Sequence, residues 1–299
     1  MTAGLRALAV GAPAAFAGDA AARWIGCAAI SALREELRVW PKPGLVTLHD
    51  GGAHADMDAA TFLVSLRALD GAFEGMARAG AERHPFATLR ALGVRAELRM
   101  LEATDGVNTH RGAIFTLGVL AAAAGRVAGE GGTLHPAALQ DTVRRTYGPA
   151  IVRHLPRASH SHGAVVLRRH GVGGARAEAH AGFPHLFDVA LPALVESRRR
   201  GAGRRAAAVQ CLLCTIAVLP DTNLLYRGGA RGLSFARSAA GAFVRAGGVH
   251  RKGWEEQVRG LHAAFVARGL SPGGSADLLA AALFVDALER GDGAAARSA

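Results

Sequence analysis

The chain has 299 residues, half of them hydrophobic, which is ample for a buried core and excludes disorder of the whole. Its 35 basic and 24 acidic residues give a net charge of +11, which favours anionic ligands, but only 5% are aromatic, so bases of single-stranded nucleic acid have few stacking partners. Three cysteines give no disulfide framework, so we expect a cytoplasmic protein, and no uncharged apolar run reaches the roughly 18 residues of a membrane span.

Apolar residues recur at helical spacing in most segments, and the alternation typical of strands is nearly absent, so we predict an all-α fold. No linker of disordered composition divides the chain, which indicates a single globular bundle over residues 1–290 with a frayed tail at 291–299. Glycine-rich connections separate the helices, and we expect them to converge and form the site. The predicted helices run over residues 17–39, 57–79, 86–104, 109–125, 136–147, 184–198, 204–219, 229–247, 252–269 and 275–290.

The segment between the first two predicted helices contains the first candidate site residues. Two prolines fix an extended path that presents Lys42, one of only two lysines in the chain. A glycine pair then precedes His54, Asp56 and Asp58 at the start of the next helix. Asp56 and Asp58 could bind Mg²⁺, which is commonly held by one or two carboxylates together with substrate phosphates. The alternative is that Asp56 only caps the helix.

The segment 104–118 predicts a helix entrance suited to an anion. Asn108 and Thr109 can cap the helix, and His110 and Arg111 then fall in its first turn. An Arg opposes the dipole at a helix N-terminus unless an anion is present, and the free backbone N–H groups there also attract phosphate. A phosphorylated substrate is therefore the first hypothesis.

Two later segments combine polar residues with tight turns. Asp221 and Asn223 follow a buried helix and are followed by Arg227, so they could hold a metal and a phosphate together, or only cap the next helix. Near the C-terminus a glycine turn that includes Gly274 leads to Ser275, a natural N-cap, and could admit phosphate. From the residues alone, we predict a basic, glycine-lined site that contains carboxylates and binds a phosphorylated ligand with Mg²⁺.

In their order, these segments resemble the triphosphoribosyl-dephospho-CoA synthase family over about residues 28–284. Residues 57–62 and 170–176 look more like the malonate decarboxylase branch of the family than the citrate lyase branch. Six ordered blocks are far more specific than any one of them. The blocks are Glu36 with 41–46, then 52–57, 106–115, 174–179 with 182–184, 221–223 with 227–229, and 270–279.

The resemblance implies an all-α transferase that joins ATP to 3′-dephospho-CoA, releasing adenine and forming 2′-(5″-triphosphoribosyl)-3′-dephospho-CoA. This product is the prosthetic-group precursor for the acyl carrier subunit of malonate decarboxylase. It would pass to a phosphoribosyl-dephospho-CoA transferase and an acyl carrier protein. We expect Mg²⁺ to accompany ATP and expect no nucleic-acid or membrane partner, whereas a homo-oligomer is left open. The alternatives are a Mg²⁺-dependent nucleotide or ADP-ribosyl hydrolase on a helical scaffold, and a non-enzymatic nucleic-acid binder.

The implied reaction also assigns roles to residues. Attack by a ribose 2′-hydroxyl calls for a carboxylate that accepts its proton, and Glu36, Asp56 and Asp221 are unranked candidates. The predicted ligands of Mg²⁺ are Asp56, Asp58, Asp221 and Asp277. Residues expected to bind the substrates are Lys42, His54, Asn108, His110, Arg111, Arg176, Glu178, Asn223, Arg227, Gly274 and Ser275.

Overall fold

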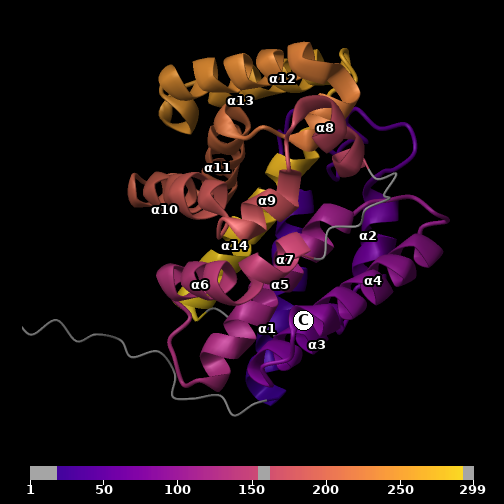
Figure 1. Ribbon diagram of the computed structural model, residues 1–299. Coiled ribbons are helices and arrows are strands. Elements are labelled where there is room, and N and C mark those ends of the chain that lie inside the picture. Colours follow the sequence, from indigo (N-terminus) through magenta and orange to yellow (C-terminus); the bar gives the residue numbers. More distant parts are fainter. Residues whose placement is uncertain (1–18, 154–161, 292–299) are drawn as a thin grey trace, which may run out of the picture.

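The computed structural model describes residues 19–153 and 162–291, and this part of the chain is built from helices without a strand, which confirms the all-α prediction (Figure 1). Apart from Gly291, the predicted tail lies outside the described residues. The elements are α1 (Asp19–Arg38), α2 (Ala59–Ala68), α3 (Ala72–Ala81), α4 (Phe86–Ala103), α5 (Arg111–Gly129), α6 (Pro136–Thr142), the π-helix η1 (Val143–Tyr147), α7 (Gly148–Arg153), α8 (His162–His170), α9 (Gly174–His180), the π-helix η2 (Leu186–Ala190), α10 (Leu191–Arg199), α11 (Arg204–Val218), α12 (Thr222–Arg245), the 3₁₀ turn η3 (Gly248–His250), α13 (Trp254–Val266) and α14 (Gly273–Arg290).

Helix α5 is the centre of the core, and it packs on α3 at backbone contact distance. A Cβ atom added at Gly80 would overlap the carbonyl oxygen of Ala122, and one added at Gly125 would overlap that of Ala77. Residues 121–124 of α5 are four alanines with no exposed surface. Because these positions carry small side chains or none, the two helix backbones can touch, and dispersion contacts accumulate along their length.

The length and apolar composition of α5 match those of a membrane-spanning helix. Its mean hydropathy reaches 1.5 over 18 residues, yet 72% of that window is buried inside the protein, as in the core helix of a soluble protein. Helices α11 and α12 meet the same criterion only as a pair, and they are bent by 57°. Burial in the bundle therefore accounts for the apolar composition of α5.

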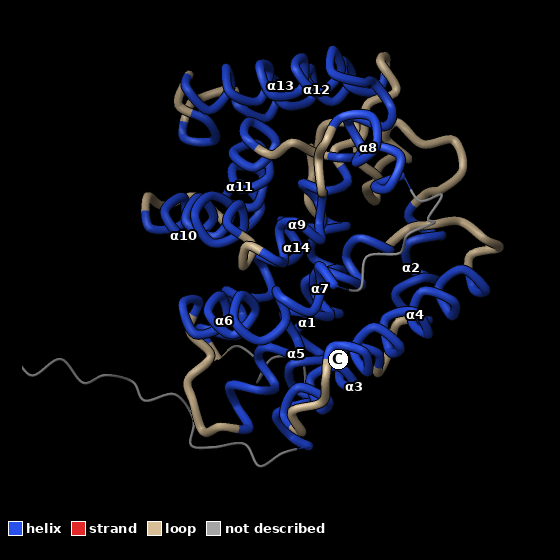
Figure 2. Tube along the Cα trace, viewed as in Figure 1, coloured by secondary structure: helices blue, strands red, loops and turns tan. Residues whose placement is uncertain are grey.

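Helices α12 and α13 lie across one end of the bundle, and α14 runs from that end through its middle (Figure 1). Helix α14 packs on α1, α5 and α11. Figure 2 shows that most connections are short; the longest within the described residues is the loop between α1 and α2, residues 39–58. This loop and the first turns of α5, α12 and α14 contain most of the predicted site residues.

The prediction of a single helix over residues 57–79 is wrong, because the structure has two helices there. Helix α2 ends before Leu69, and α3 begins after Gly71, whose φ of 71° is left-handed and stops the helix. Leu69 and Phe73 are both buried, so the apolar periodicity continues across the turn. Periodicity alone therefore could not reveal the break.

Helices α8 and α9 and the first turns of α12 fall between the predicted helices, so the prediction also needs correction at residues 162–180 and 222–228. Helix α7 was not predicted either. Helix α12 begins directly after Asp221 and is interrupted at Gly229, where φ is 59° and ψ is −161°. Gly274 lies in the first turn of α14. The site is thus formed mainly by helix ends, and the expectation that glycine-rich loops form it is not confirmed.

Candidate functional site

Five buried or half-buried side chains from distant parts of the sequence meet where α1 ends and α5, α12 and α14 begin. We call Glu36, Lys42, His110, Asp221 and Asp277 the inner cluster. Lys42 contacts Glu36 directly. Burial raises the pKa of Asp277 and the charges of Asp221 and Glu36 add to that shift, while burial lowers the pKa of His110 and the charge of Lys42 adds to it, so these groups lie near one another. Three of the five are carboxylates, so the cluster concentrates negative charge in a basic protein.

Lys42 and Glu36 form a buried ion pair. The Lys42 ammonium has no exposed surface and donates to Glu36 Oε1 at 2.6 Å and to the Glu36 carbonyl at 2.7 Å. Burial lowers the pKa of Lys42, and the carboxylate of Glu36 opposes that shift. The proline segment therefore turns Lys42 into the protein, where it holds the end of α1.

Asp221 ties the start of α12 to the start of α14. Its Oδ1 accepts from the backbone N–H groups of Asn223 at 2.9 Å and Leu224 at 3.4 Å. Its Oδ2 accepts from the backbone N–H of Ser275 at 2.8 Å and from the Ser275 hydroxyl at 2.9 Å. Burial raises the pKa of Asp221, and these hydrogen bonds oppose the shift. The capping alternative for Asp221 is confirmed, and all four hydrogen bonds occupy its oxygens.

Ser275 does not cap α14 as predicted, because that helix begins at Gly273 after Pro272. The hydroxyl of Ser275 instead serves Asp221. Asn223 packs against the same turn: a Cβ added at Gly273 would lie 2.5 Å from Asn223 Nδ2. The missing side chain at Gly273 therefore allows α12 and α14 to meet at their N-termini.

Asp277 differs from the other carboxylates of the cluster in having uncommitted oxygens. Its carboxylate makes no hydrogen bond or ion pair within the described part of the chain. It lies against Gly112 in the first turn of α5, where a Cβ would overlap Asp277 Oδ2. Burial raises its pKa well above the ordinary value, and the charges of Asp221 and Glu36 add to the shift. A partly exposed carboxylate in this setting can accept a proton.

His110 closes the cluster on the α5 side. It is 3% exposed, and its Nδ1 lies 2.6 Å from the hydroxyl of Ser65 and 3.1 Å from that of Thr109. Burial, followed by the charge of Lys42, lowers the pKa of His110 to about 3. The imidazole is therefore neutral at physiological pH and cannot act there as a cation for phosphate.

A second group, which we call the rim, joins His54, Asp56 and Arg227. Arg227 donates to the carbonyls of Ala53 at 3.0 Å and Gly269 at 3.2 Å and to His54 Nδ1 at 3.0 Å. Since Arg is only a donor, Nδ1 of His54 accepts, and its Nε2 donates to the Ser271 hydroxyl at 2.9 Å. Burial lowers the pKa of His54, and the charge of Arg227 adds to this effect. Arg227 thus links three segments while remaining exposed.

The predicted metal carboxylates do not assemble as one group. Asp58, rather than Asp56, caps α2: its Oδ1 accepts from Thr61 N and Thr61 Oγ1, both at 2.9 Å. The Asp56 side chain is 64% exposed and lies 3.6 Å from His54 Nδ1. Across residues 19–153 and 162–291 there is no set of three or more His, Cys, Asp or Glu residues arranged to hold a metal.

The first turn of α5 carries the predicted anion-binding residues. Asn108 Oδ1 accepts from the backbone N–H of Arg111 at 3.2 Å, so the capping role is confirmed. The guanidinium of Arg111 pairs with Glu97 of α4, with Nε 2.5 Å from Oε1. Arg176 of α9 is close enough for the charges of Arg90 and Glu97 to act on it, and burial lowers its pKa. Glu97 thus pairs with Arg111 and acts on Arg176 through its charge, and a phosphate that replaced Glu97 beside Arg111 would meet both arginines' charges.

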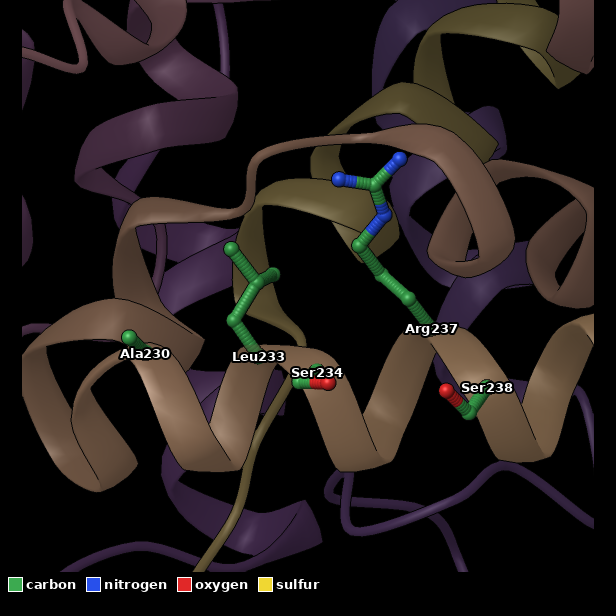
Figure 3. Close-up of a pocket in the computed structure, with 5 residues that line it drawn as sticks. All are labelled: Ala230, Leu233, Ser234, Arg237 and Ser238. Atoms are coloured by element: carbon green, nitrogen blue, oxygen red, sulfur yellow. The ribbon is translucent and has the colours of Figure 1, made fainter.

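Glu178 has a structural partner. Its carboxylate accepts from the backbone N–H of His185 at 3.2 Å and contacts His185 Nδ1 at 2.7 Å, which fixes the turn after α9. A separate surface pocket of about 300 Å³ lies along α12 (Figure 3). It is lined by Ala230, Leu233, Ser234, Arg237 and Ser238, none of which the sequence predicted for the site.

Sequence reasoning missed Ser65, Glu97, Gly112 and Ser271. Each is an ordinary residue by its local pattern and gains its role from a partner far away in the chain, such as His110, which lies 45 residues after Ser65. Asp277 was predicted as a metal ligand, and the structure gives it a further property, an unpaired and partly exposed carboxylate.

Comparison with known proteins identifies relatives over most of the chain. Residues 22–296 match the family of ATP:dephospho-CoA triphosphoribosyl transferases. A 2-(5″-triphosphoribosyl)-3′-dephosphocoenzyme-A synthase of Klebsiella pneumoniae is 39% identical, covering 87% of this chain and 89% of the relative. Probable synthases of the same name from Stutzerimonas stutzeri and Acinetobacter calcoaceticus are 41% and 36% identical, covering 87% and 85% of this chain and 90% and 87% of the relatives. No solved structure matches significantly.

Proposed function

Because the chain belongs to the ATP:dephospho-CoA triphosphoribosyl transferase family, we propose that it joins ATP to 3′-dephospho-CoA, giving 2′-(5″-triphosphoribosyl)-3′-dephospho-CoA and adenine. The match over residues 22–296 carries this proposal. The inner cluster supports it, since the half-buried carboxylate of Asp277 has free oxygens, and hydroxyl attack at a sugar carbon needs such a proton acceptor.

In the proposed reaction the ribose 2′-hydroxyl of dephospho-CoA attacks the anomeric carbon of ATP as the bond to adenine breaks. We assign Asp277 as the acceptor of the hydroxyl proton. Glu36 is engaged by Lys42, the oxygens of Asp221 accept four hydrogen bonds, and Asp56 lies on the rim. Asp277 alone combines a raised pKa with uncommitted oxygens, so a proton moved to it is well accommodated.

The triphosphate is retained in the product, so its charges need binding and orientation. We assign three cations to the triphosphate: Arg227 of the rim, Arg111 of α5 and Arg176 of α9. Mg²⁺ bound to the phosphates would neutralise part of their charge. Asp56 fits this ion, because its exposed oxygens have only a distant contact with His54 and Mg²⁺ commonly needs one or two carboxylates besides phosphate.

The biological setting is part of the proposal. The pattern of residues 57–62 and 170–176 favours the malonate decarboxylase branch, so the product would pass to a phosphoribosyl-dephospho-CoA transferase and then to an acyl carrier protein in the cytoplasm. The three cysteines without a disulfide framework and the buried α5 support that location.

The test is incubation of the full chain with ATP, Mg²⁺ and 3′-dephospho-CoA, followed by mass detection of adenine and the triphosphoribosylated product. We expect both products in equal amounts and neither when dephospho-CoA is omitted. Absence of adenine from the complete mixture would overturn the proposal. Hydrolysis of ATP without dephospho-CoA would instead favour the nucleotide hydrolase.

A further inference from the structure

One ring nitrogen of His110 lacks a partner among residues 19–153 and 162–291. Nε2 is buried, and it makes no hydrogen bond to any residue in the described part of the chain. The other nitrogen, Nδ1, lies 2.6 Å from the hydroxyl of Ser65, and the hydroxyl of Thr109 lies beside both. Buried polar atoms in folded proteins are nearly always hydrogen-bonded, so an unpaired one at the inner cluster indicates a position that a ligand atom completes.

The hydrogen bonds around Nδ1 decide which nitrogen carries the proton. The Thr109 hydroxyl donates to the Ser65 oxygen at 2.8 Å. The Ser65 hydrogen is then directed to His110 Nδ1 at 2.6 Å, so Nδ1 is the acceptor and Nε2 carries the hydrogen. In the opposite tautomer Nδ1–H would donate to the Ser65 oxygen, and the hydrogen bond between the two hydroxyls would have to reverse, with Ser65 donating to Thr109. The arrangement therefore leaves a buried N–H donor unpaired.

The surroundings of His110 select the kind of acceptor. Phe62 packs against the His110 ring with centroids 4.8 Å apart at an interplanar angle of 65°. The ring is neutral, because burial and the charge of Lys42 lower its pKa to about 3. The neighbouring carboxylates of the inner cluster would repel a phosphate. A neutral donor beside an aromatic side chain fits an uncharged, flat acceptor such as a heteroaromatic base.

We propose that the Nε2–H of His110 donates a hydrogen bond to a ring nitrogen of a substrate purine, with Ser65 and Thr109 as positioning residues that hold this tautomer. This inference rests on the proposed function, since both substrates of that reaction carry adenine. If the purine is the adenine of ATP, the hydrogen bond also stabilises the negative charge that develops on the ring as the glycosidic bond breaks. If it is the adenine of dephospho-CoA, the contact orients the attacking nucleotide.

A first experiment measures the tautomer directly. In ¹⁵N-labelled full chain at neutral pH, we expect the two-bond ¹⁵N–¹H spectrum of His110 to show a neutral ring protonated at Nε2. ATP and dephospho-CoA are then added separately, and the nucleotide that shifts the Nε2 resonance identifies the purine. A ring protonated at Nδ1, or an Nε2 signal that neither nucleotide moves, would overturn the inference.

Substitutions give a second readout. We expect His110→Phe to weaken binding of that nucleotide by about 5- to 10-fold, and His110→Gln, which keeps an N–H donor, to restore part of it. Thr109→Val should shift the population toward the Nδ1 tautomer and weaken binding, while Thr109→Ser keeps the hydroxyl and serves as the matched control. Unchanged affinity of His110→Phe for both nucleotides contradicts the inference. Where that variant fails to fold, an unchanged tautomer and affinity in Thr109→Val contradict it equally.

The two proposals fail in different ways. If the protein forms no triphosphoribosylated product but ATP or dephospho-CoA still shifts His110 Nε2, the reaction is wrong and the purine contact stands. If the product forms and His110 Nε2 does not respond to either substrate, the reaction stands and the contact is wrong.

Discussion

In the inner cluster the charges are buried or half-buried, and Lys42 and Asp221 have fixed partners, whereas Arg111 and Arg227 at the surface are at least partly exposed and their partners can be exchanged. Lys42 has no exposed surface and is held by Glu36, while the Arg111 side chain is 41% exposed and paired with Glu97. The same residue types thus serve different purposes. Removing one partner of the buried Lys42–Glu36 pair costs several kcal/mol, whereas solvent screens the exposed Arg111–Glu97 pair, so a phosphate can replace Glu97 at a small cost in free energy.

The largest expected effect is on catalysis. Asp277→Asn keeps the shape of the side chain but removes the proton acceptor, so we expect adenine release to fall by about 10²- to 10⁴-fold while substrate binding stays near its original strength. Adenine and product are measured by mass spectrometry. The matched control is Asp58→Asn, which alters an exposed helix cap. Activity within a few-fold of the unmodified protein would remove Asp277 from the mechanism.

The next effect is on stability in the inner cluster. Lys42→Met leaves the Glu36 carboxylate buried without its partner, and we expect a loss of about 3 to 5 kcal/mol in the free energy of unfolding in urea. Removing both charges in Lys42→Met with Glu36→Leu should recover most of that loss. If the single variant is as stable as the parent, the pair is not the constraint that the geometry indicates.

Asp277 should also affect how stability depends on pH. Its pKa is raised in the folded state, so between the ordinary value of 3.8 and the higher folded value the folded protein binds more protons than the unfolded chain. Its contribution to stability is complete below about pH 3.8 and is lost as the pH rises through the folded value. We expect Asp277→Asn to be more thermostable than the parent at pH 7 and to lose that advantage near pH 4. Parallel melting curves at all pH values would contradict this.

The smallest effect on stability is expected outside the cluster. Arg111→Ala should change the free energy of unfolding by only about 0 to 1 kcal/mol, because the ion pair with Glu97 is partly exposed. Its effect should appear as a higher KM for ATP, with Arg111→Lys intermediate, since Lys keeps the charge but loses the bidentate geometry. Steady-state kinetics at varied ATP concentration provide the measurement, and an unchanged KM would separate Arg111 from the triphosphate.

The helical class, most helix boundaries and the capping role of Asp221 could be read from local pattern, because periodicity and caps are encoded over a few residues. The break at Gly71 could not, since apolar residues continue across it. The inward turn of Lys42 depends on Glu36 and on packing around both, and the engagement of Arg111 depends on Glu97, 14 residues away. Pairings of this kind arise from tertiary packing, which a sequence pattern records only weakly.

The backbone contact between α3 and α5 also affects the position of His110 at the far end of α5. Gly125 lies 15 residues along α5 from His110, roughly 20 Å at the helical rise. Because the backbones of α3 and α5 touch there, α5 moves as a rigid unit. A side chain introduced at Gly80 or Gly125 would therefore displace the N-terminus of α5 as well as its middle. Slower turnover in an otherwise folded Gly125→Ala protein would then indicate that the His110 imidazole has moved, although the substitution itself lies far from the proposed nucleotide contacts.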